Sequence, residues 1–127
     1  MKIILKNIGI IALGIIIGMI INMGLIILGG IIIAPSDNFE PMNALNWDIK
    51  YFIFPFLAHS LGTFSGAFIV SKLSKKTNIA IPLIVGFYFL SGGIYMATIL
   101  PTPIWFILLD ITVGYIPMAL LGWKLAK

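Results

Sequence analysis

The chain has 127 residues, of which 61% are hydrophobic and 9% are charged. Average soluble domains are about 45–50% apolar and about 25% charged, so the composition excludes a soluble globular domain and a disordered segment. The eight lysines are too scattered along the chain to form the basic face of a nucleic-acid-binding protein, which leaves an integral membrane protein.

The first predicted membrane span covers residues 8–33, an apolar stretch preceded by lysines. Lysines before an apolar run are also typical of a signal peptide. The apolar region of a signal peptide has only about 7–15 residues, however, and this run is longer. We therefore expect a retained helix. The following segment, 35–50, contains two prolines and three of the four acidic residues. It is expected to be a solvated outer loop, because its acidic residues lack the spacing of a calcium-binding loop.

Three further spans are predicted at residues 51–73, 79–100 and 104–125. The link Pro101-Thr102-Pro103 is short enough to make the last two spans an antiparallel hairpin. All four runs are apolar on every side, whereas membrane β-strands alternate apolar and polar residues. The sequence predicts an all-α fold: one domain, 1–127, with four transmembrane helices in an up-down bundle.

The distribution of lysines predicts the orientation of the bundle. Cytoplasmic loops of membrane proteins carry an excess of lysine and arginine. With four spans, seven lysines lie on one side and only Lys50 lies on the other. We therefore expect a multi-pass protein of the bacterial cytoplasmic membrane, with both termini in the cytoplasm and the bilayer as its surroundings. The seven are Lys2, Lys6, Lys72, Lys75, Lys76, Lys124 and Lys127.

Two ionisable residues, His59 and Asp110, fall inside predicted spans. Each costs at least about 2.5–3.5 kcal/mol at a helix centre on insertion scales, so such residues are default candidates for function. At 1.5 Å per residue, His59 lies about 12 Å and Asp110 about 9 Å below the outer ends of their spans. The two spans run in the same direction, and we expect the two side chains to meet.

Other polar side chains are predicted near the same depth, one from each of three spans. They are Asn22, Thr63 and Tyr95. With His59 and Asp110 they would form a polar core in the outer half of the bundle that binds a ligand or a proton. The alternative is that the pair only fixes the register of the helices.

Small residues recur at four-residue spacing in the first three spans, which permits close approach of helices. The expected helix-packing positions are Gly14, Gly18, Gly62, Gly66 and Gly93. Packing within the chain is the favoured interpretation. A homodimer formed through the first span is the alternative.

Two segments carry a resemblance. They are Ala58-His59-Ser60-Leu61-Gly62-Thr63 with Gly66-Ala67, and Pro103-Ile104-Trp105-Phe106 leading to Asp110 and Tyr115-Ile116-Pro117. This pattern resembles a family of uncharacterised small bacterial four-helix inner-membrane proteins. The resemblance implies no substrate, cofactor or catalytic residue.

The expected function is the binding or transport of a small solute or protons at the His59–Asp110 site. No cysteine, phosphate-binding loop, zinc-protease motif or nucleophile elbow is present, so no cofactor or metal is expected and catalysis is not favoured. Two alternatives remain: a non-catalytic accessory or assembly subunit of a larger membrane complex, and an intramembrane lipid-modifying enzyme.

Overall fold

The computed structural model describes residues 1–75 and 78–127, and within these ranges it is helical with no strand. Four helical segments are long and apolar enough to cross a membrane, which confirms the prediction of an all-helical fold with four such segments. Lys76, one of the lysines used to predict orientation, lies outside the described residues. The elements are α1 (Lys2–Ile32), η1 (Ala44–Asn46), η2 (Ile49–Phe52), α2 (Ile53–Leu73), α3 (Ala80–Ile99), α4 (Ile104–Val113) and α5 (Ile116–Leu125).

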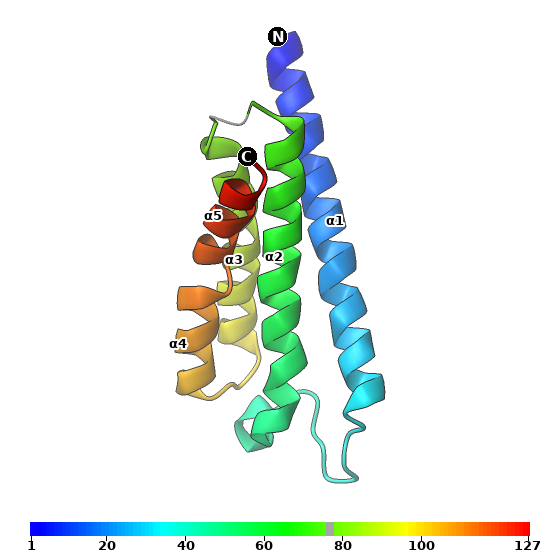
Figure 1. The fold of residues 1–127 in the computed structure, drawn as a ribbon. Coiled ribbons are helices and arrows are strands. Elements are labelled where there is room, and N and C mark those ends of the chain that lie inside the picture. The colour runs from blue at the N-terminus through cyan, green and yellow to red at the C-terminus, as the bar shows by residue number, and fades with distance from the viewer. Residues whose placement is uncertain (76–77) are drawn as a thin grey trace.

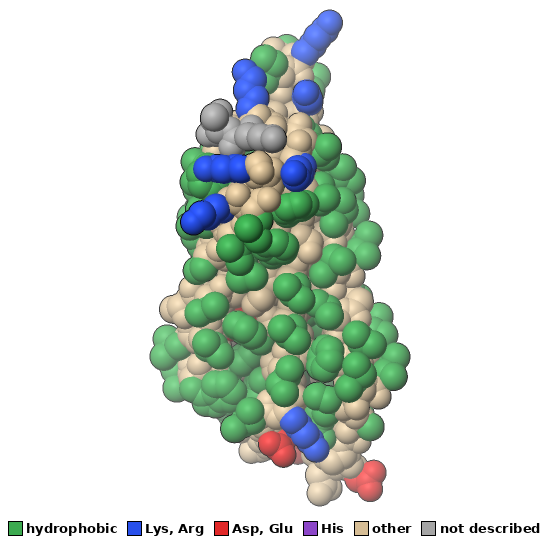
Figure 2. Space-filling view, viewed as in Figure 1, with side chains coloured by type: hydrophobic (Ala, Val, Ile, Leu, Met, Phe, Trp, Pro, Cys, Tyr) green, Lys and Arg blue, Asp and Glu red, His purple; other side chains and the backbone are tan. Residues whose placement is uncertain are grey.

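The helices run alternately up and down, with α4 and α5 together forming the fourth segment, and α2 lies at the centre of the bundle (Figure 1). It packs against α1 along most of its length and against α3 and α5 on its other sides. Both termini lie at one end of the bundle, and the connection between α1 and α2 lies at the other. Figure 2 shows lysine side chains gathered at the first end, acidic side chains at the second and an apolar belt between them.

The fourth predicted span is divided into two helices. α4 ends at Val113 and α5 begins at Ile116, with Gly114 and Tyr115 between them. Pro117 explains the break, because proline has no N–H to donate to the carbonyl of Val113 and its ring clashes with that carbonyl in a regular helix. Tyr115 accordingly leaves the helical conformation, with φ −122° and ψ −77°. The break changes the direction in which the Tyr115 side chain points.

The segment between α1 and α2 is an ordered cap rather than an extended loop. Its two short 3-10 helices bury Ala44 and Phe52, which pack with Phe106 of α4. The backbone N–H of Ala44 donates to the carbonyl of Pro101 at 2.8 Å, which ties the cap to the α3–α4 connection. Rings of Phe52 and Phe106 lie 4.7 Å apart. The cap therefore packs against the end of the bundle opposite the termini.

Two apolar clusters hold the two ends of the bundle. One lies toward the termini and is formed by Ile10, Val70, Ile81 and Val85. The other is the cluster of the cap, around Phe52. His59 lies between them along α2. The His59–Asp110 pair thus lies between two apolar layers.

Candidate functional site

His59 on α2 and Asp110 on α4 form an ion pair or hydrogen bond in the interior of the bundle. Nδ1 of His59 lies 2.8 Å from Oδ1 and 2.9 Å from Oδ2 of Asp110. The Asp110 side chain is 7% exposed and the His59 side chain 24%. An ionised carboxylate only accepts hydrogen bonds. We therefore assign the proton to Nδ1 of His59, which donates to the carboxylate.

Tyr115 is the third member of this site. Its hydroxyl donates to Oδ2 of Asp110 at 3.1 Å, and the residue is only 2% exposed. Its ring also lies against the imidazole of His59, with centroids 5.7 Å apart and planes inclined by 25°. The carboxylate of Asp110 thus has two donors, one from each neighbouring ring. Together these contacts satisfy a charge that would otherwise be costly to bury.

Gly93 of α3 makes room for Tyr115. A Cβ atom at position 93 would lie 2.6 Å from Cζ of the tyrosine ring, too close for any real side chain. The break between α4 and α5 directs the Tyr115 side chain toward α3. The absence of a side chain at Gly93 leaves room for the tyrosine ring. Gly93 was expected to be a helix-packing position. The structure places a tyrosine ring against it rather than a helix backbone.

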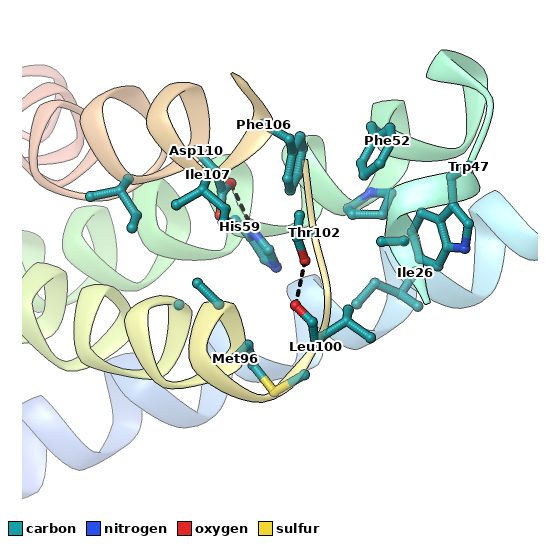
Figure 3. A pocket seen from close by; sticks show the side chains of 15 residues that line it. Ile26, Trp47, Phe52, His59, Met96, Leu100, Thr102, Phe106, Ile107 and Asp110 are labelled. Atoms are coloured by element: carbon teal, nitrogen blue, oxygen red, sulfur yellow. Dashed lines mark hydrogen bonds and ion pairs between the residues drawn. The ribbon is translucent and has the colours of Figure 1, made fainter. Parts of the chain in front are cut away.

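A cavity of about 230 Å³ adjoins the pair on the side of the cap. Its walls come from every helix of the bundle except α5, and they are almost entirely apolar (Figure 3). The polar groups that line it are His59, Asp110 and Thr102. The Thr102 hydroxyl donates to the carbonyl of Leu100 at 2.8 Å, so it is already engaged.

The second ring nitrogen of His59 faces this cavity. Figure 3 shows Nδ1 directed at Asp110 and Nε2 directed into the open space. None of the described residues forms a hydrogen bond with Nε2. When Nδ1 carries the proton of a neutral imidazole, Nε2 is an acceptor. The site therefore presents one hydrogen-bond acceptor to an apolar cavity.

A second cavity, of about 460 Å³, lies on the other side of His59 between α1 and α3. Three residues line both cavities: His59, Gly93 and Met96. The larger cavity also meets Asn22 of α1 and Ser91 of α3. The imidazole of His59 thus borders both cavities.

The other three predicted site residues differ in how they relate to the pair. Thr63 is fully buried one turn from His59, and its hydroxyl has no hydrogen-bond partner among the described residues. Asn22 lines the second cavity with a buried side-chain oxygen that likewise has none. Tyr95 lines the same cavity but is 63% exposed. None of the three is hydrogen-bonded to the pair.

Four of the five glycines predicted to pack helices meet each other between α1 and α2. A Cβ on Gly18 would lie 2.7 Å from the carbonyl oxygen of Gly62, and one on Gly62 would lie 2.8 Å from that of Gly18. Gly14 and Gly66 form the same reciprocal contact one turn away, at 2.9 and 2.7 Å. This is packing within one chain. It brings α1 close enough for Asn22 to border the space beside His59.

Tyr115 was not among the predicted site residues. The signal in the sequence was its position two residues before Pro117, because a proline inside a span disrupts the helix at the residues just before it. The pattern of residues alone did not predict which way the freed side chain turns. That direction depends on the space left by Gly93 on another helix.

The chemistry available here is proton exchange and hydrogen bonding. No group of three or more histidine, cysteine or acidic residues that could hold a metal ion occurs in residues 1–75 and 78–127. A histidine held at Nδ1 by a carboxylate has a fixed ring orientation and a fixed tautomer, which leaves Nε2 as the hydrogen-bond acceptor. Comparison with known proteins adds nothing to this description: no family model, no curated protein and no solved structure matches the chain.

Proposed function

We propose that this chain is a multi-pass membrane protein that binds a small ligand or a proton at His59 and exchanges a proton there. The observation that supports this best is the imidazole held at Nδ1 by Asp110, with Nε2 directed into an apolar cavity. A pair that only fixed helix register would need no cavity beside it. Binding sites for small molecules are typically concave and apolar, with a few placed polar groups.

We further propose that the protein lies in a bacterial cytoplasmic membrane with both termini in the cytoplasm. Lysine side chains at the end of the bundle that holds the termini support this orientation (Figure 2). The acidic cap would then face outward, and the His59 site would lie in the outer half of the bilayer. A ligand would reach the site at membrane depth.

The test of ligand or proton exchange is a pH titration of the imidazole signal of His59. The chain has one histidine, so protein labelled with ¹⁵N-histidine and purified without a histidine tag gives the signal of this residue alone. Histidine ordinarily changes charge between about pH 5 and 8. Asp110 and Tyr115 are the ionisable groups in contact with it. We expect the signal to shift with pH in lipid vesicles, and to shift differently in Asp110→Asn. A response that is flat between about pH 5 and 8 would contradict the proposal.

A further inference from the structure

The smaller cavity beside His59, of about 230 Å³, receives the free ring nitrogen of that residue. Its other polar side chains are already engaged within the described part of the chain. The Asp110 carboxylate accepts from His59 and Tyr115, and the Thr102 hydroxyl donates to a backbone carbonyl. With the proton of the neutral imidazole on Nδ1, Nε2 is an acceptor. A ligand in this cavity therefore needs a hydrogen-bond donor at one point and apolar surface elsewhere.

Three aromatic side chains, Trp47, Phe52 and Phe106, line the same cavity on the side of the cap. Their rings contact one another in series, with centroids 5.3 Å apart between Trp47 and Phe52 and 4.7 Å apart between Phe52 and Phe106. Met96 of α3 lies across the open space from Phe106 (Figure 3). Aromatic rings and the thioether of methionine both pack favourably against another aromatic ring. The walls therefore favour a planar aromatic ligand over an aliphatic one of the same size.

The volume of the cavity suits one aromatic ring. An engineered apolar cavity of about 150 Å³ in another protein binds benzene. At about 230 Å³, this cavity has room for a ring that carries a hydroxyl group and a small further substituent. Water is a poor occupant, because each buried water needs about two to four polar partners and most of the walls offer none.

The walls of this cavity favour an uncharged ligand. No lysine lines it among the described residues. Lys50 lines a neighbouring cavity, which shares Trp47 and two other residues with this one, but it does not line this cavity itself. An anion placed beside His59 would therefore meet the Asp110 carboxylate and no fixed cation, which is costly in apolar surroundings. A cation would have to displace one of the two donors that already engage the carboxylate.

We infer that the ligand of His59 is an uncharged single-ring phenol, bound in the smaller cavity. Its hydroxyl donates to Nε2 of His59, and its ring packs between the aromatic side chains and Met96. Two small molecules each lack one of these features: cyclohexanol has the donor without the aromatic ring, and toluene has the ring without the donor. This inference rests on the proposed function and names the class of ligand.

The experiment follows the Nε2 signal of His59 while phenol is added. The full-length protein, labelled with ¹⁵N-histidine and free of a histidine tag, is placed in phosphatidylcholine nanodiscs at a pH where the ring is neutral. We expect phenol to shift the Nε2 signal saturably, because a hydrogen bond to an unprotonated ring nitrogen changes its ¹⁵N frequency. At equal concentrations in the lipid, cyclohexanol should bind about tenfold more weakly, because it lacks the aromatic contacts. Toluene should not produce the shift of a hydrogen bond.

Two matched variants test whether this cavity holds the phenol. Ala97 of α3 lines the cavity, so Ala97→Phe places a ring in the space. Ala12 of α1 is exposed and lines neither cavity beside His59, so Ala12→Phe is the control. We expect Ala97→Phe to weaken the phenol response by about tenfold or more and Ala12→Phe to leave it unchanged. Both variants keep His59, so an unchanged Nδ1 signal shows that the pair with Asp110 is intact. The comparison of the three ligands uses the wild-type protein and depends on neither variant.

The outcomes separate the inference from the proposed function. A phenol response that does not saturate, or one that cyclohexanol matches, would overturn the inference, as would a response that Ala97→Phe leaves unchanged. If the His59 signal still titrates with pH in that case, the proposed function stands and its ligand is of another class. If phenol binds as expected but the signal is flat with pH, the phenol site stands and proton exchange at His59 fails.

Discussion

The hydroxyl of Tyr115 donates to Oδ2 of Asp110 across the break between α4 and α5, at 3.1 Å. This bond joins two helices that the sequence predicts as one. It gives the carboxylate a second donor besides His59, in a place where water has little access. The geometry of the site thus depends on a helix break as well as on two facing side chains.

Removal of the Tyr115 hydroxyl should weaken the contacts around Asp110 but leave the His59–Asp110 pair in place. We expect Tyr115→Phe to lower the free energy of unfolding by about 1 kcal/mol, the usual net contribution of a hydrogen bond, and to shift the His59 imidazole signal. Tyr95→Phe is the matched control, since Tyr95 is 63% exposed and its hydroxyl forms no hydrogen bond with the described residues. Reversible unfolding in mixed micelles measures both variants. Equal effects would mean that the Tyr115 contact adds nothing.

The pairing of His59 with Asp110 is measurable as a coupling energy. We expect His59→Ala and Asp110→Ala to destabilise the bundle individually, and the double variant to lose less than the sum. The coupling should be about 0.5–2 kcal/mol, the range of contacting residues and of polar pairs within membranes. The same unfolding assay gives all three values. Strict additivity would show that the two side chains do not stabilise each other.

The contact between α1 and α2 predicts different effects of two alanine substitutions on stability. Gly62→Ala would bring a Cβ to 2.8 Å from the carbonyl oxygen of Gly18, so the helices must separate. We expect a loss of about 1–3 kcal/mol, typical of overpacking. Gly24→Ala on the open face of α1 meets nothing within 4 Å and should be neutral or stabilising by up to about 1 kcal/mol. Measurement of unfolding in the same detergent distinguishes the two. A Gly62→Ala protein as stable as wild type would contradict the close approach.

Orientation can be read from single cysteines, because the chain has none of its own. We expect Asn38→Cys in the cap to react with a membrane-impermeant maleimide in intact cells. A cysteine appended after Lys127 should react only after the cells are opened. The reverse pattern would show that the lysine-rich end faces outward. Reaction of both in intact cells would show that the number of spans is not four.

Much of the architecture follows from the order of apolar and polar residues along the sequence. The apolar runs predicted four helices, and their observed bounds differ from the predicted ones mainly at the N-terminal side, where α1 already begins at Lys2. The depth of His59 and Asp110 follows from residue counting, because helix rise is constant. Properties of a single helix, such as its bounds and the depth of a residue along it, can therefore be predicted from the sequence.

Features that depend on contacts between two helices could not be predicted from the sequence in the same way. Tyr95 and Tyr115 have the same side chain and both lie in predicted spans, yet one is exposed and the other is buried against Asp110. The difference comes from Pro117, which breaks the helix, and from Gly93, which leaves room on α3 for the tyrosine ring. The ordered cap is a similar case, since it depends on contacts between Phe52 and Phe106 that lie far apart in sequence.

The central claim is that Asp110 holds the proton of the neutral His59 imidazole on Nδ1 and leaves Nε2 free to accept a hydrogen bond in the cavity. The most direct test is the ¹⁵N spectrum of the single histidine in lipid, at a pH where the ring is neutral, because the two ring tautomers give distinct signals. The account predicts the tautomer protonated at Nδ1 in the wild type and loss of that preference in Asp110→Asn. A wild-type spectrum with the proton on Nε2, or one that Asp110→Asn leaves unchanged, would contradict it.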